Sequence, residues 1–221
     1  MLPHDTRLQI ENILSGNVIT GNRDHCTAIR NHFSQRDGAG RTVKADFKAN
    51  EWIKERQAAY LNQYATQHNC WIPPGDFGRE FSYGGEARVY LAPGKRTVIK
   101  TNDGRYYATW QQYFTSILLH NALFPSTAYT LLGFAIVPNF NKETVIHAVL
   151  QQPYIVSDRL VELDEVRTFI EHNDFVNVKD QDYRHVGLKL KLEDLHDENV
   201  LVQNDVLFFI DTVFYFGGPE L

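Results

Sequence analysis

The sequence predicts a mixed α+β fold in which helical segments precede a small antiparallel sheet. Apolar residues recur at helical spacing in the N-terminal quarter and again over residues 106–124. Short β-branched and aromatic runs, separated by turn residues, follow at several points and predict strands. The last two runs, Val200–Val202 and Val206–Ile210, are joined by an Asn-Asp turn and predict a hairpin.

The composition is that of a globular protein with a substantial core. The chain has 221 residues, of which 43% are hydrophobic, and a net charge of −5. No cluster of lysine or arginine stands out, so we expect neither a nucleic-acid partner nor a membrane-surface partner. The apolar runs are too short to span a membrane, and the N-terminus lacks a signal-peptide pattern. Cys26 and Cys70 form no motif, and free thiols favour a cytoplasmic location.

Residues 1–75 are expected to form a helical segment. Helical spacing covers 8–14, 26–33 and 46–68, and the two prolines in Trp71–Gly75 end the last stretch and mark a boundary. We interpret this segment as an appendage packed on the domain that follows. A cap that binds substrate or a partner is the alternative, although no chemically distinctive residues support it.

Residues 76–152 are expected to form a small antiparallel sheet with one helix across it. The helix at 106–124 carries an apolar stripe that includes Tyr107 and Phe114. Gln111 lies on this stripe and is placed to accept a hydrogen bond from Lys100, and the alternative is that it only caps the core. A second helix, at 161–175, follows the sheet. The predicted strands are 87–91, 97–100, 128–138 and 144–152, and a further extended run lies at 186–190.

A glycine turn and a strand lysine form the first candidate site. Gly84 and Gly85 precede the strand at 87–91, and the next strand ends at Lys100. Glycine lets backbone N–H groups approach a phosphate closely because no Cβ intervenes. Lys100 on the following strand is then in reach of the same phosphates. The alternatives are a glycine-rich hairpin without a ligand and a solvated lysine at a strand end.

The second candidate site is an acidic loop, Asp194–Asn199, that leads into the C-terminal hairpin. The loop enters the hairpin at the end where Asp211 leaves it, so Asp194, Asn199 and Asp211 should converge. Phosphoryl transfer needs oxygen ligands for magnesium and a carboxylate that orients the attacking hydroxyl. The alternatives are a solvated surface loop and a metal site built from His196, Asp197 and Glu198.

These motifs together resemble the protein-kinase-like superfamily and, within it, the kinase-like domain of polyvalent proteins. Such proteins are modular and belong to phages and conjugative elements of bacteria. Asp194-Leu195-His196 is similar to the D-L-H of aminoglycoside phosphotransferases, and Glu198–Leu201 to the E-N-I-L of protein kinases. The resemblance runs from Gly84 to Asp211 and includes GGEARVY at 84–90, VIK at 98–100, HNALFP at 120–125, YTLLGF at 129–134, VLQQPYIV at 149–156 and DLHDENVL at 194–201.

The resemblance implies a kinase-like fold with an N-terminal lobe at 76–152 and a truncated, mainly helical C-terminal lobe at 153–221. It also implies ATP and magnesium as cofactors, and a nucleotide and a phosphate acceptor, protein or small molecule, as partners. It implies Asp194 and Lys100 as catalytic residues and Asn199 and Asp211 as metal ligands. The implied nucleotide-binding residues are Gly84, Gly85, Lys100, Gln111 and Gln152.

The sequence also departs from the kinase pattern. No acidic residue lies between Asp103 and Glu143, where kinases carry a helix glutamate that pairs with the strand lysine. Leu192 stands where the catalytic loop has its histidine, and only ten residues follow Asp211. Three functions therefore remain open: an ATP- and magnesium-dependent phosphotransferase, a pseudokinase that binds nucleotide or protein, and a small-molecule kinase of the aminoglycoside-phosphotransferase type.

Overall fold

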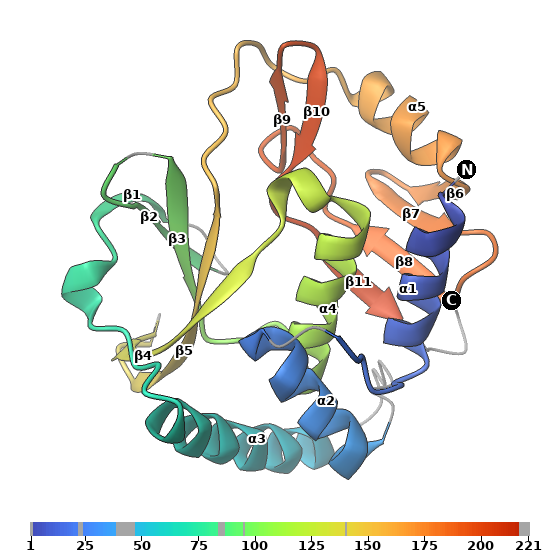
Figure 1. The fold of residues 1–221 in the computed structure, drawn as a ribbon. Coiled ribbons are helices and arrows are strands. Elements are labelled where there is room, and N and C mark those ends of the chain that lie inside the picture. The colour runs from blue at the N-terminus through green and yellow to red at the C-terminus, as the bar shows by residue number, and fades with distance from the viewer. Residues whose placement is uncertain are drawn as a thin grey trace.

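The computed structural model describes residues 2–21, 24–38, 47–83, 87–94, 96–139 and 141–216 of the chain. Figure 1 shows a five-stranded sheet and a smaller C-terminal sheet on the two sides of a central helix, α4 (Trp110–Leu123). The N-terminal helices pack against the same helix. The predicted α+β class is confirmed. None of the described helices is both long enough and apolar enough to cross a membrane.

The three predicted N-terminal helices are confirmed as α1 (His4–Leu14), α2 (His25–Asp37) and α3 (Phe47–Gln67). Helix α2 begins where the Asp24 side chain accepts a hydrogen bond of 2.9 Å from the Thr27 backbone N–H. Arg30 of α2 is buried, and its guanidinium donates to the backbone oxygen of Ile13 at the end of α1. This buried contact fixes α1 against α2.

The first sheet contains every strand predicted upstream of residue 153. Its order is β1-β2-β3-β5-β4, and all neighbouring strands are antiparallel. Lys100 lies in β3, opposite Val89 on one side and Leu150 on the other. The strands are β1 (Arg79–Tyr83), β2 (Ala87–Leu91), β3 (Thr97–Asn102), β4 (Thr130–Pro138) and β5 (Thr144–Pro153).

Helix α4 begins at Trp110, four residues later than its apolar spacing predicted. The Thr109 side chain accepts a hydrogen bond from the Gln112 backbone N–H and so defines the helix start. The Gln112 side chain in turn accepts from the Ala108 backbone N–H at 3.0 Å. These reciprocal bonds favour a turn over residues 105–109 and explain why the helix does not extend back to Tyr106.

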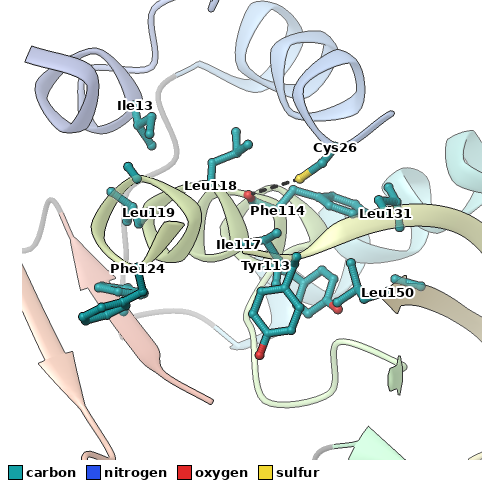
Figure 2. Close-up of a cluster of buried hydrophobic side chains, with 14 of the residues drawn as sticks. Ile13, Cys26, Tyr113, Phe114, Ile117, Leu118, Leu119, Phe124, Leu131 and Leu150 are labelled. Atoms are coloured by element: carbon teal, nitrogen blue, oxygen red, sulfur yellow. Dashed lines mark hydrogen bonds between the residues drawn. The ribbon is translucent and has the colours of Figure 1, made fainter. Parts of the chain in front are cut away.

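The main hydrophobic core surrounds α4. Figure 2 shows Ile13 and Cys26 from the N-terminal helices above α4, and Leu131 and Leu150 from the sheet beside it. Almost every side chain of α4 is buried, as expected of a helix with packing partners on several sides. The Cys26 thiol donates to the Phe114 backbone oxygen at 3.8 Å. The N-terminal helices therefore share one continuous core with the sheet.

The second face of the sheet carries a smaller cluster of five buried residues. Phe77 reaches it from the segment between α3 and β1 and packs with Ala92, Ile99, Ala135 and Val149. The same segment is hydrogen-bonded to β4, because the Ile72 backbone N–H donates to the Phe134 oxygen at 2.7 Å and Phe134 N–H donates to the Cys70 oxygen at 2.9 Å. The chain leaving α3 is thus attached to the sheet edge.

The described residues of the C-terminal part form one helix and six strands. Strands β6, β7, β8 and β11 form an antiparallel sheet in the order β11-β8-β7-β6, and β9 pairs with β10 as the predicted hairpin. Helix α5 starts at a capping box between Glu162 and Glu165. The elements are α5 (Leu163–His172), β6 (Phe175–Lys179), β7 (Asp182–His185), β8 (Leu190–Glu193), β9 (Val200–Gln203), β10 (Val206–Phe209) and β11 (Val213–Phe216).

The expectation of a mainly helical C-terminal lobe is wrong for the described residues. It came from the family resemblance, whereas the local pattern has the two-residue period of strands. Leu190 and Leu192 are buried, and Lys191 and Glu193 between and after them are partly exposed. Phe214 and Phe216 alternate with Val213 and Tyr215 in the same way. Such alternation buries one face of a sheet and gives no helical stripe.

Gly133 is the position at which we expect a single methyl group to damage the fold most. Its φ is +155°, and an added Cβ would lie 2.0 Å from the Cys70 backbone oxygen. Gly133→Ala should lower the free energy of unfolding by about 2 kcal/mol or more, because backbone atoms must shift at a sheet edge. Thermal denaturation should show this as a fall in Tm of roughly 4 °C or more.

Gly75→Ala is the matched control, because an added Cβ there meets nothing within 4 Å. Its Tm should stay within about 1–2 °C of the wild type. Equal Tm values for the two variants would contradict the close approach of Cys70 to β4.

Candidate active site

The Asp194–Asn199 loop is held together by its own side chains. The Asn199 side-chain Nδ2 donates to the Asp194 backbone oxygen at 2.9 Å and to its carboxylate Oδ2 at 3.0 Å. His196 Nε2 lies 3.3 Å from the other carboxylate oxygen, Oδ1. Asp194 has a φ of +70°, a left-handed conformation that aspartate adopts more readily than most residues. The carboxylate is therefore fixed in direction while remaining half exposed.

The hairpin β9–β10 brings Asp211 back to this loop. The Ile210 backbone N–H donates to the Asn199 backbone oxygen at 3.0 Å, so the residue before Asp211 is bonded to the last residue of the loop. The convergence expected from the loop-and-hairpin pattern is present. With Nδ2 of Asn199 engaged by Asp194, the side-chain oxygen is the atom that remains for a metal ion.

Lys100 crosses from the sheet to the end of the hairpin. Its Nζ donates to the Ile210 backbone oxygen at 2.8 Å and lies 3.4 Å from the Asp211 carboxylate. The Lys100 side chain is buried, whereas 48% of the Asp211 side chain is exposed. The buried ammonium is thereby compensated by a carboxylate and a carbonyl, and the carboxylate still faces solvent.

Tyr129 is a member of the site that the sequence patterns did not reveal. Its hydroxyl donates to the Ile210 backbone oxygen at 2.6 Å, and it accepts from Lys100 Nζ at 3.3 Å. The ammonium also lies 5.3 Å from the centre of the tyrosine ring, within range of a cation–π contact. Burial and the nearby Asp211 charge raise the pKa of Tyr129 well above its usual value, so its hydroxyl stays protonated.

His120 of α4 contacts the residue that follows Asp211. Its Nδ1 lies 2.8 Å from the Thr212 hydroxyl, and its Nε2 lies 3.1 Å from the Thr127 backbone oxygen. Burial lowers the pKa of His120 to about 4, and the positive charge of Lys100 acts in the same direction. The neutral ring that donates through Nε2 to Thr127 accepts from Thr212 at Nδ1. His120 therefore holds the residue that follows Asp211.

Gln111 is not a partner of Lys100. Its side chain donates to the Ser34 hydroxyl at 3.2 Å and to the Gly38 backbone oxygen at 2.8 Å, both at the end of α2. Because α4 starts at Trp110, Gln111 lies in its first turn and faces the N-terminal helices. The predicted Lys100–Gln111 hydrogen bond is wrong, and Asp211 and Ile210 take its place.

The remaining nucleotide-binding candidates are placed as follows. The Gln152 side chain is buried and donates to the Thr127 backbone oxygen at 2.7 Å, so it stabilises the interior. A contact between its main chain and adenine stays a prediction. Gly84 and Gly85 lie outside the described residues. No group of three or more His, Cys, Asp or Glu side chains in the described ranges is arranged to hold a metal ion, which disfavours the site built on His196.

Asn199 and Asp211 fit magnesium in donor chemistry. Both offer side-chain oxygens, and magnesium in nucleotide sites is held by one or two such ligands together with phosphate oxygens and water. A bound metal would sit beside the Lys100 ammonium, which also attracts phosphate. The arrangement therefore places an ammonium, two side-chain oxygen donors and the Asp194 carboxylate at one end of the hairpin.

The family described as "Serine/Threonine/Tyrosine Kinase found in polyvalent proteins" matches residues 54–217, which is more than half of the chain. The match begins within α3 and includes both sheets, the hairpin and α5. Curated proteins give no match.

The neutral buried His120 should make stability depend on pH. Burial lowers the pKa of His120 in the folded chain to about 4 from its ordinary value of about 6.5, so the unfolded chain binds a proton first as the pH falls. The stability contributed by neutral His120 is present above pH 6.5 and is lost towards pH 4, by up to about 3 kcal/mol. Denaturant unfolding at pH 7, 6, 5 and 4 measures this loss.

His120→Gln should reduce that loss of stability, because glutamine does not titrate. His4→Gln, which removes an exposed histidine at the start of α1, should leave the pH dependence as in the wild type. A pH profile that is the same for all three proteins would show that His120 is not buried in its neutral form.

Proposed function

Because the chain belongs to the family of serine/threonine/tyrosine kinases found in polyvalent proteins, we propose that it is an ATP- and magnesium-dependent phosphotransferase. The observation that carries this proposal is the convergence of Lys100, Asp211 and Asn199 beside the carboxylate of Asp194. A lysine for phosphate, two oxygen ligands for metal and a carboxylate base are the groups that phosphoryl transfer uses.

Lys100 binds phosphate oxygens in this proposal. Its ammonium is already fixed in direction by the Ile210 backbone oxygen and the Tyr129 hydroxyl, so it loses little side-chain freedom when a nucleotide arrives. A magnesium ion, when bound, would neutralise the charge that develops on the transferred phosphoryl group. Asn199 and Asp211 hold that ion, and His120 positions Asp211 through Thr212.

Asp194 orients the acceptor and takes its proton. Asn199 donates to one carboxylate oxygen, and His196 lies beside the other, which sets the direction of the carboxylate before an acceptor binds. A base that is fixed in this way keeps the acceptor hydroxyl in line with the phosphorus.

A pseudokinase is the second candidate, and the environment of Lys100 favours it. Helix α4 carries no carboxylate that could pair with the lysine, and Lys100 instead forms an ion pair with Asp211, which is also a proposed ligand of the metal ion. In this alternative the lysine and the aspartate stay paired and the module binds nucleotide, or a protein, without transfer.

Asp211→Asn should remove the magnesium-dependent part of nucleotide binding. ATP at 100 times its Kd stabilises a protein by about 2.7 kcal/mol, which raises Tm by roughly 5 °C or more for a chain of this size. The wild type should show this shift with magnesium present. The variant should show a much smaller one, because the metal loses its charged ligand.

Asp205→Asn is the matched control, the same chemical change on a 92% exposed side chain in the turn of the same hairpin. It should keep the full magnesium-dependent shift. Retention of that shift in Asp211→Asn would show that the metal is held elsewhere.

Asp194→Asn should abolish phosphate transfer while keeping nucleotide binding. Asparagine tolerates the left-handed backbone at this position and keeps the side-chain shape, so only the proton acceptor is lost. ATP turnover, measured as ADP release with and without acceptor, should fall about 10²–10⁴-fold. Nucleotide binding by a wild type that transfers no phosphate to any acceptor would instead identify the pseudokinase.

A further inference from the structure

A cavity of about 920 Å³ opens beside Asp194. One part of its wall comes from the first turns of α3 and the turn before α4. The rest comes from the β6–β7 turn, the end of β8 with the Asp194–Asn199 loop, and β11. This volume lies within the range of small-molecule and cofactor sites.

The cavity lies on one side only of the proposed reaction centre. Asp194 and His196 line it, whereas Lys100, Asn199 and Asp211 do not. The proposed phosphate-binding and metal-binding groups therefore lie outside its described lining, whereas the proposed base, Asp194, belongs to that lining and is bonded to Asn199. A molecule in the cavity can present a hydroxyl to Asp194 without occupying the nucleotide position.

The described residues of the walls carry an excess of negative charge. Among them the lining has five carboxylates and two cations, Lys54 and Arg105. Both cations are engaged. Lys54 Nζ donates to the backbone oxygens of Gly104 and Tyr107, at 2.6 and 2.9 Å. Arg105 is paired with Asp103 at 2.7 Å. The lining carboxylates are Glu51, Asp180, Asp182, Glu193 and Asp194.

Lys191 bridges two of the five carboxylates, Asp182 and Glu193. The other three carboxylates have no strong ion pair among the described residues. Of these, Asp194 accepts a hydrogen bond from the neutral Asn199 side chain and has only His196 beside it. Asp180 has Lys179 at 3.9 Å, a pair with both partners largely exposed and so of little strength. Glu51 is exposed and makes no ion pair among the described residues. A cationic ligand would meet these three charges at once.

Aromatic side chains complete the walls. Tyr106 is 59% exposed at the turn before α4, and the partly exposed Tyr215 of β11 also lines the cavity. Aromatic faces attract ammonium and guanidinium groups and pack against the aliphatic stems of lysine and arginine. Both features of the lining, charge and aromatic surface, therefore favour the same ligands.

We propose that this cavity receives the phosphate acceptor, and that the acceptor is a basic peptide segment in which a serine, threonine or tyrosine is flanked by lysine or arginine. The proposal rests on the proposed function, because the family is one of serine, threonine and tyrosine kinases. The wall is built from several separated segments and is open to solvent. Such a site can bind an extended peptide, whereas an enclosed site suits a small molecule.

The proposed transfer step uses ATP, the peptide hydroxyl and the Asp194 carboxylate. The peptide hydroxyl oxygen forms a bond to the γ-phosphorus of ATP, and the bond between that phosphorus and the β–γ bridging oxygen breaks. The hydroxyl proton passes to the Asp194 carboxylate, and ADP leaves with the electron pair of the broken bond.

Binding without nucleotide tests this assignment. Two fluorescent peptides with the same serine and tyrosine content are compared by anisotropy, one with lysine and arginine flanks and one with glutamate flanks. The basic peptide should bind at least tenfold more tightly, and its affinity should fall with salt. The double variant Glu51→Gln/Asp180→Asn should weaken it about threefold to tenfold.

Asp164→Asn/Glu171→Gln, the same change of charge on the exposed side of α5, is the matched control and should bind as the wild type does. Equal binding of both peptides, or a loss that is the same in the two double variants, would overturn the proposal. Phosphate transfer that persists in that case leaves the proposed function standing. Transfer to a small cationic alcohol but to neither peptide would also overturn it and identify a small-molecule kinase.

Discussion

The contact of Lys100 with the end of the β9–β10 hairpin is the interaction on which the candidate site depends. A buried ammonium requires compensation by hydrogen bonds and opposite charge. The compensation comes from Ile210 and Asp211, more than a hundred positions later in the chain. This requirement holds the Asp194–Asn199 loop, which is bonded to Ile210, against the five-stranded sheet. Tyr129 shares the same carbonyl and shields the contact.

Helix α4 explains why a kinase-like site can be assembled without a helix carboxylate. The helix is buried on nearly all sides, so each polar side chain on it needs a partner in a different neighbour. Gln111 finds one in α2, and His120 finds one in Thr212. The helix therefore stabilises the site through the contact of His120 with Thr212, next to Asp211. The partners of Lys100 come from the end of the hairpin and not from the helix. The charge that kinases place on this helix is supplied here by Asp211.

The elements that the sequence predicted well are those with a strong local period. The β-branched and aromatic runs of β2 and β5, the apolar stripe of α4 and the Asn-Asp turn of the hairpin each depend on neighbours within a few residues. The C-terminal sheet was mispredicted as mainly helical because a family resemblance was preferred to the alternation around Leu190 and Phe214. Local pattern was the better guide there, since a two-residue period buries one face of a sheet.

The sequence by itself determined the order of the elements and the convergence of Asp194, Asn199 and Asp211, because a loop and hairpin of fixed length return the chain to one end. It did not determine the partners of Lys100, the contacts that Tyr129 and His120 make in the site, or the acidic cavity. Those depend on which surfaces meet when distant segments pack around α4. Packing of this kind is a property of the whole core, so only the tertiary structure decided which charges lie together.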